Sequence, residues 1–159
     1  SVRTRFDAAV LRLPLLGRLA RGYNAARFAG TLAMLAAAGV PILRALQTAA
    51  DTLPNRALRA DALLALGDVR EGAPLASALA QHTRFPPLIA MFARLGEQTG
   101  QLPLMLQRAS TQVAAEVQRR AMALATALEP VLIVGMGAVV LLIVLAVLMP
   151  IIQLNQWAR

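Results

Sequence analysis

The sequence VLIVGMGAVVLLIVLAVLM, at residues 131–149, is apolar and uncharged along its whole length. No Asp, Glu, Lys or Arg lies between Glu129 and Arg159, and Pro150 closes the most apolar part. About 20 helical residues span about 30 Å, which is the thickness of the hydrocarbon core of a bilayer. A helix of a soluble protein normally carries a polar face, and this one has none. The run therefore predicts a single transmembrane helix over residues 130–152.

The distribution of positive charge predicts how this helix is oriented. Of the 16 Lys and Arg residues, all of them Arg, only Arg159 follows the apolar run. Positively charged segments flank membrane helices mainly on the cytoplasmic side. We therefore expect an inner-membrane protein with the bulk of this chain in the cytoplasm and a short periplasmic tail over residues 153–159. Trp157 lies where an interfacial aromatic anchor is expected.

Composition restricts the fold and the chemistry. The 159 residues are 58% hydrophobic and only 4% aromatic, with a mean hydropathy of +0.60, so the chain differs from a typical soluble globule. Its core must be built largely from Ala and Leu, which favour helices over sheets. There is no cysteine, which excludes a disulfide scaffold, a thiolate metal site and a cysteine nucleophile.

Glycine and proline divide the stretch before the apolar run into six helices. Gly39 is expected to end the first helix as its C′ residue, and Pro41 to begin the second at position N1. The last helix meets no break before Pro130, which should kink it at the membrane surface. The predicted fold is all-α: a six-helix cytoplasmic bundle over residues 21–128, whose last helix continues into the transmembrane helix. The expected helices cover residues 23–38, 41–53, the stretch after 55 as far as 70, 74–82, 87–98, and 103 onward.

Residues 1–20 form a basic segment. As far as Arg27 the chain holds six Arg against one Asp, a pattern that suits the anionic face of a membrane. Nucleic acid is the competing partner, but the aromatic residues Phe6 and Tyr23 are isolated and form no base-stacking series. We therefore expect a juxtamembrane segment and no nucleic-acid binding. A membrane-tethered nucleic-acid-binding domain is the alternative from another class, given the net charge of +8.

No catalytic, cofactor-binding or metal site is predicted, and we expect the protein not to be an enzyme. The single histidine, His82, lies at a helix end, where capping is its expected role. No HExxH-like ligand spacing occurs, and GEQTG at residues 96–100 lacks the lysine and the length of a phosphate-binding loop. Ser77 and Ser110 have neither a nucleophile elbow nor a nearby base in the sequence.

Two carboxylates stand out by position. Glu97 falls in the last turn of a predicted helix, where the macrodipole disfavours negative charge, so we expect a partner from elsewhere, such as an Arg or a cation. Glu129 precedes Pro130 at the membrane edge and could pair with an Arg of a neighbouring helix; for both carboxylates, a solvated surface acid is the alternative.

Gly135 and Gly137 would let another helix approach closely, or they reflect ordinary glycine use in membrane helices. The candidates for structural or partner-contact roles are Gly39, Pro41, Gly96, Glu97, Gly100, Glu129, Pro130, Gly135 and Gly137.

Four runs of the sequence, in order and with matching spacing, resemble the F component of the type II secretion system. They are ARFAGTLAMLAAAGVPILRAL (26–46), VREGAPLASAL (69–79), FPPLIAMFARLGEQTGQL (85–102) and LEPVLIVGMGAVVLLIVLAVLMPIIQLNQ (128–156). No single run is decisive, but the four together are specific. The same family is similar to the platform protein of type IV pilus assembly. RLPLLGRLARGYNAARF (12–28) and the closing LNQ (154–156) favour the secretion branch.

The resemblance implies the second of two related cytoplasmic domains, followed by the last of three membrane helices. It implies a non-enzymatic inner-membrane platform that couples the cytoplasmic secretion ATPase to pseudopilus assembly for protein export across the outer membrane. The expected partners are that ATPase, its membrane-anchoring partner, pseudopilins, the lipid bilayer and further copies of the chain in a homo-oligomer. A platform of type IV pilus assembly is the alternative. Family members often carry an acidic residue where this chain has Pro103, so a cation site at Glu97 is not assumed.

Overall fold

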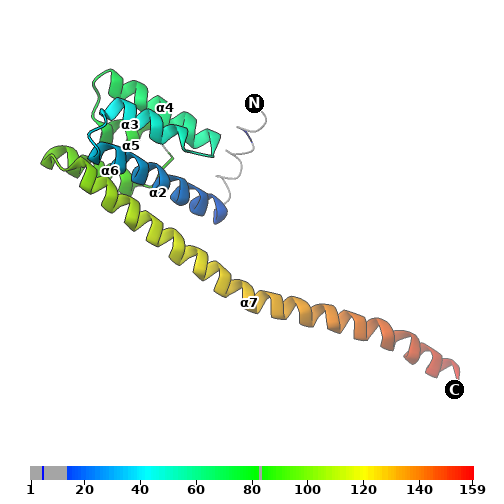
Figure 1. Cartoon of the computed structure of the whole chain (residues 1–159). Helices are drawn as coiled ribbons and strands as arrows, with labels where there is room; N and C mark the ends of the chain where they lie inside the picture. The colour runs from blue at the N-terminus through cyan, green and yellow to red at the C-terminus, as the bar shows by residue number, and fades with distance from the viewer. Residues whose placement is uncertain (1–4, 6–13, 83) are drawn as a thin grey trace. The chain divides into compact units, whose positions relative to one another are not determined.

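The computed structural model describes residue 5 and residues 14–82 and 84–159. Within these residues the chain forms six helices and no strand (Figure 1), which confirms the all-α prediction. The helices are α2 (Leu16–Ala37), α3 (Ile42–Asp51), α4 (Arg56–Arg70), α5 (Leu75–His82), α6 (Pro87–Thr99) and α7 (Leu102–Trp157). The chain divides into two compact units, Ser1–Arg120 and Ala121–Arg159, and the division falls within α7. Most of the predicted basic segment over residues 1–20 lies outside the described residues.

Glycines in the left-handed conformation end two of the helices. After α2, Gly39 has φ of 80°, and the N–H of Val40 donates to a carbonyl of the preceding turn at 3.0 Å. After α6, Gly100 has φ of 69°, and the N–H of Gln101 donates to the Gly96 carbonyl at 2.9 Å. A side chain would be strained at such positive φ values, so glycine suits both positions. Gly39 is therefore the C′ residue that its place in the sequence predicts.

The starts of two helices differ from the prediction at proline. Pro41 is extended, with ψ of 139°, so it precedes α3 and the first helical residue is Ile42. The Pro41 carbonyl nevertheless accepts the first helical hydrogen bond, from the N–H of Ala45 at 2.9 Å. Likewise α5 begins at Leu75, one residue after the predicted Pro74. In both cases the proline lies just outside the helix that it was expected to begin.

The first described helix also begins earlier than predicted. α2 starts at Leu16 and not at Tyr23, and it contains Gly17 and Gly22, both of which are buried. Glycine weakens a helix by about 1 kcal/mol relative to Ala, which is why the sequence favoured a later start. Tertiary packing of these small residues overrides that local preference.

One apolar core holds the unit Ser1–Arg120 together. Within the series α2 to α6, each helix contacts its neighbour in the chain. α2 lies beside the first part of α7 (Figure 1), where the Ser110 hydroxyl donates to the Ala26 carbonyl at 2.8 Å. The rings of Phe28 and Phe85, 5.0 Å apart, join α2 to the connection between α5 and α6. The largest fully buried side chains are Phe28, Leu32, Leu46, Leu58, Leu79, Ile89 and Leu106.

The last helix of the bundle continues into the apolar run as one helix, α7, as the sequence predicts. On its first half, Leu106, Ala109 and Val113 are buried in the core and Val117 is half-buried. From Ala121 on, the side chains of α7 are exposed or half-exposed. The helix continues through Pro130 and Pro150. By length and composition it can cross a membrane, and none of its most apolar 18-residue window is buried within the chain.

Candidate functional site

The carboxylate of Glu97, near the end of α6, caps the beginning of α5. Its Oε1 accepts a hydrogen bond from the N–H of Leu75 at 2.5 Å, and its Oε2 accepts one from the N–H of Ala76 at 3.2 Å. The first N–H groups of a helix have no partner within the helix and carry partial positive charge, so a carboxylate is well placed there. Glu97 thus has a partner outside its own helix, which is the backbone of α5. Among the described residues, no Arg forms an ion pair with it.

The two glycines that flank Glu97 make the turn from α6 into α7 possible. A Cβ on Gly96 would lie 2.6 Å from the Cα of Leu102 and 3.1 Å from the Cβ of Met105, so only glycine lets these two helices approach so closely. Gly100 supplies the positive φ that ends α6. The segment that superficially resembles a phosphate-binding loop is therefore an architectural joint between α5, α6 and α7.

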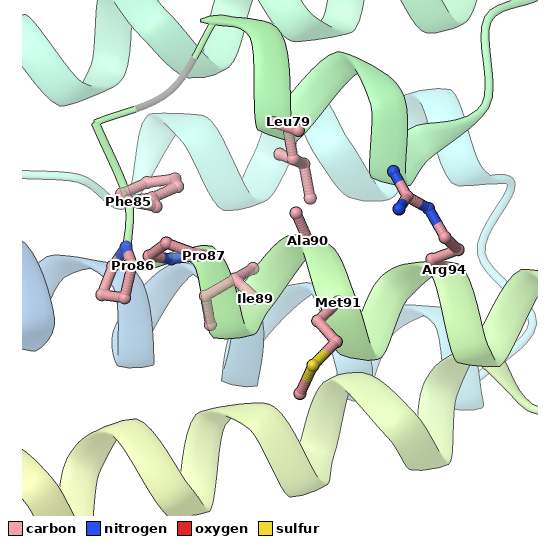
Figure 2. Close-up of a pocket in the computed structure, with 9 residues that line it drawn as sticks. Leu79, Phe85, Pro86, Pro87, Ile89, Ala90, Met91 and Arg94 are labelled. Carbon is pink, nitrogen blue, oxygen red and sulfur yellow. The ribbon is translucent and has the colours of Figure 1, made fainter.

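Next to this joint, two hollows lie between α5 and α6, on either side of Arg94. The first hollow has a volume of about 390 Å³. Figure 2 shows Arg94 extending from α6 toward α5 in this hollow, which Leu79, Ala90 and Met91 also line. The second, of about 410 Å³, also has Arg94 in its lining, together with Glu97. Among the described residues no ion pair engages Arg94. The face therefore offers an apolar surface beside one accessible cation, which fits an apolar side chain next to a carboxylate.

A polar cluster ties the connection between α5 and α6 to α4. His82 Nε2 lies 2.6 Å from Asp68 Oδ2, so the histidine at the end of α5 pairs with a side chain of α4. The buried Asp61 accepts a hydrogen bond from the N–H of Arg84 at 3.2 Å, and the Arg84 Nε lies 3.6 Å from the same carboxylate oxygen. Burial raises the pKa of Asp61 above its ordinary value, and the positive charge of Arg84 opposes part of that rise. Sequence patterns did not single out these four residues as a cluster, because the two aspartates lie on α4 whereas His82 and Arg84 lie at the end of α5 and in the connection after it.

The candidates in and beside the apolar run, in the unit Ala121–Arg159, have no partner within the described part of the chain. Glu129 forms no ion pair there, and a Cβ on Gly135 or on Gly137 would meet no atom within 4 Å. Pro130 lies inside the helix. Pairing of Glu129 with another helix, and close helix packing at the glycines, therefore remain predictions about an assembly. Among the described residues no group of three or more His, Cys, Asp or Glu residues is placed to hold a metal ion.

A known protein family matches most of the chain, including most of the residues described above. The family model described as type II secretion system (T2SS), protein F, matches residues 28–150, a range that includes the joint at Glu97 and the apolar run. The chain belongs to the T2SS protein F family. Membership in the family agrees with the resemblance found in the four sequence runs.

Individual relatives of the T2SS protein F family give the same result. A type II secretion system protein F of Pseudomonas aeruginosa is 42% identical over 154 residues, which is 97% of this chain and 38% of that protein. One of Aeromonas hydrophila is 40% identical over 154 residues, or 97% of this chain and 40% of that protein. A type IV pilus assembly protein PilC of Thermus thermophilus is 35% identical over 153 residues, or 96% of this chain and 38% of that protein. The chain thus spans about two fifths of the length of these relatives.

Proposed function

We propose that this chain is the second cytoplasmic bundle and the last membrane helix of an inner-membrane platform protein of type II secretion. In that role it couples the cytoplasmic secretion ATPase to assembly of a pseudopilus, and it does no chemistry of its own. The observation that carries the proposal is the 42% identity to a type II secretion system protein F over 97% of the chain. The apolar, uncovered part of α7 supports the placement in a membrane.

The joint at Glu97 supports the mechanical part of the proposal. Glu97 ties α6 to the start of α5, and Gly96 holds α6 against the first turns of α7. A displacement of the α5–α6 pair would therefore reach α7 through packed atoms without a flexible linker. Rigid helices with tight contacts are the elements that transmit such displacements. α7 itself is helical from Leu102 to Trp157.

We further propose that the α5–α6 face around Arg94 receives the ATPase, through an apolar side chain beside a carboxylate. The membrane-anchoring partner of the ATPase, the pseudopilins and further copies of the chain would bind other surfaces. Photocrosslinking tests the ATPase contact: a benzophenone amino acid replaces Met91 on this face, or Met34 on α2 as the matched control. Both methionines are well exposed, at 51% and 64%.

The experiment uses the full-length protein in cells with an active secretion system. A crosslink to the ATPase from position 91 and none from position 34 is expected. A crosslink from position 34 alone would place the ATPase on another face. If neither position, nor a further one on α4 such as Leu64, crosslinks to the ATPase, the coupling part of the proposal fails.

Topology has its own test, made simple by the absence of cysteine from this chain. Ser77→Cys on α5 and Asn155→Cys near the end of the chain each introduce one thiol. A membrane-impermeant maleimide added to intact spheroplasts should label position 155 and spare position 77 until the cells are lysed. The reverse pattern would overturn the cytoplasmic placement of the bundle.

A platform of type IV pilus assembly is the second candidate, because PilC of Thermus thermophilus is 35% identical over 96% of the chain. Both candidates are membrane platforms that would transmit displacements through the same helix contacts, and they differ in the assembly that they serve. Replacing the matching segment of the Pseudomonas aeruginosa F protein by this chain should restore protein export. Recovery of piliation in a PilC chimera, without recovery of export in the F chimera, would favour the pilus branch.

A further inference from the structure

A third hollow, of about 280 Å³, lies between α2, the start of α6 and α7. Its apolar lining includes Leu88 and Val117, and its charged lining consists of Arg18, Glu116 and Arg120. The two arginines come from positions about a hundred residues apart in the chain. This hollow shares Pro86 and Pro87 with the first hollow of the α5–α6 face, but its lining includes neither Arg94 nor Glu97.

Antiparallel packing of α2 on α7 brings the two arginines together. A Cβ on Gly22 would lie 2.5 Å from the Cγ2 of Val117, so the helices touch there, and further along α2 the Ala26 carbonyl accepts from the Ser110 hydroxyl. The order therefore runs forward on α2 and backward on α7. Arg18, one turn before Gly22, consequently reaches the same end as Arg120, about one turn after Val117.

The arginines leave this hollow with an excess of positive charge. Arg120 pairs with Glu116 one turn earlier on α7, which orients its guanidinium beside the hollow. Arg18 has no ion pair among the described residues. The charged lining therefore sums to +1, from two arginines and one glutamate. A guanidinium presents paired N–H groups whose geometry matches a phosphate group.

The position of Arg120 in the chain indicates where such a phosphate would come from. Only residues 121–129 separate Arg120 from Pro130, the start of the predicted transmembrane helix. Basic residues next to a membrane helix attract the anionic lipids of the cytoplasmic leaflet. An apolar lining beside two arginines also matches a lipid headgroup with its first acyl carbons better than it matches a free ion.

We propose that this hollow binds the headgroup of an anionic phospholipid. Arg18 and Arg120 would hold the phosphate, and the side chains of Leu88 and Val117 would contact the glycerol and upper acyl chain. The lipid would anchor the membrane-proximal end of the bundle to the bilayer surface. This inference rests on the proposed membrane placement. An acidic segment of a protein partner is the rival occupant.

The test compares lipid retention by the whole chain, purified in detergent, using native mass spectrometry. The probes are phosphatidylglycerol and phosphatidylcholine with identical acyl chains. The wild type should retain phosphatidylglycerol preferentially, and Arg18→Gln and Arg120→Gln should each weaken its binding about fivefold. Arg119→Gln is the matched control, because it removes the same charge from the neighbouring residue, which does not line the hollow. It should leave lipid retention unchanged.

Several results would overturn the inference. An equal loss in Arg119→Gln would mean diffuse surface charge, and no loss in either lining variant would mean that the hollow is not the site. Equal retention of both lipids by the wild type, with Arg18-dependent crosslinking to a protein, would assign the hollow to an acidic partner segment. Unchanged thermal unfolding of the variants confirms that they fold. Variants that insert into membranes but show no lipid effect contradict this inference alone, whereas a wild-type chain that fails to insert contradicts the proposed function.

Discussion

Glu97 Oε1 lies 2.5 Å from the backbone nitrogen of Leu75, so the carboxylate at the end of one helix caps the beginning of the preceding one. The contact closes the α5–α6 pair at the end where α7 begins. It gives a structural reason for the Gly-Glu-x-x-Gly segment at residues 96–100. Its consequences for stability can be measured directly.

Removing this cap should destabilise the bundle. Glu97→Ala leaves two N–H groups at the start of α5 without their acceptor, and a lost cap costs about 1–2 kcal/mol. Thermal unfolding of the whole chain in detergent, followed by circular dichroism, measures the effect. Gln98→Ala, at the exposed neighbouring position, should change the midpoint little. Equal midpoints for the two variants would show that the cap contributes nothing.

Two glycines within helices should respond in opposite ways to the same substitution. Gly96→Ala places a methyl group 2.6 Å from the Cα of Leu102, so the backbone must shift at a cost of about 1–3 kcal/mol. Gly67→Ala, within α4, meets no atom within 4 Å and should stabilise the chain by about 0.5–1 kcal/mol. Chemical denaturation of both variants gives the two free-energy changes. A tolerated Gly96→Ala would contradict the close contact of α6 with α7.

The buried carboxylate of Asp61 should make stability depend on pH. Because burial raises the folded-state pKa of Asp61 above 3.8, its contribution is fully present below that value and is lost as pH rises through the folded-state pKa. The wild type should therefore lose stability relative to Asp61→Asn between about pH 4 and neutral pH. Unfolding midpoints of both proteins across this range provide the measurement.

Asp51 supplies a control of opposite sign for that experiment. A hydrogen bond from Arg59, at 2.6 Å, lowers the pKa of Asp51, so its stabilising contribution is present above 3.8 and is lost as pH falls through the folded-state pKa. Relative to Asp51→Asn, the wild type should gain stability as pH rises. If Asp61 also behaved in this way, the attraction of Arg84 would outweigh the effect of burial.

The glycines of the apolar helix should reveal a packing face. Gly135 and Gly137 are two residues apart, so they point about 200° apart around α7 and cannot both face one partner helix. We expect Gly135→Leu or Gly137→Leu, but not both, to weaken self-association of the chain in detergent, measured by light scattering after size exclusion. If neither variant changes the mass distribution, the glycines reflect ordinary use in a membrane helix.

The fold could be predicted from the sequence to a large extent because its signals are local. Helix ends depend on residues such as Gly39, whose conformational freedom acts within one turn, and the transmembrane helix depends on the apolar content of one continuous run. The errors arose where packing opposes local preference. Gly22 weakens a helix in isolation, yet α2 runs through it because the missing side chain lets Val117 approach.

The amino-acid sequence alone determined the number of helices among the described residues, the uncharged run and the uneven distribution of arginine. Each of these is a property of neighbouring residues or of residue order along the chain. The partners of Glu97 and His82 were decided by folding, since each lies on a different helix from its partner. Folding also decided that Arg18 and Arg120 line one hollow. Helix packing sets such distances, and periodicity along one helix carries no information about what lies across from it.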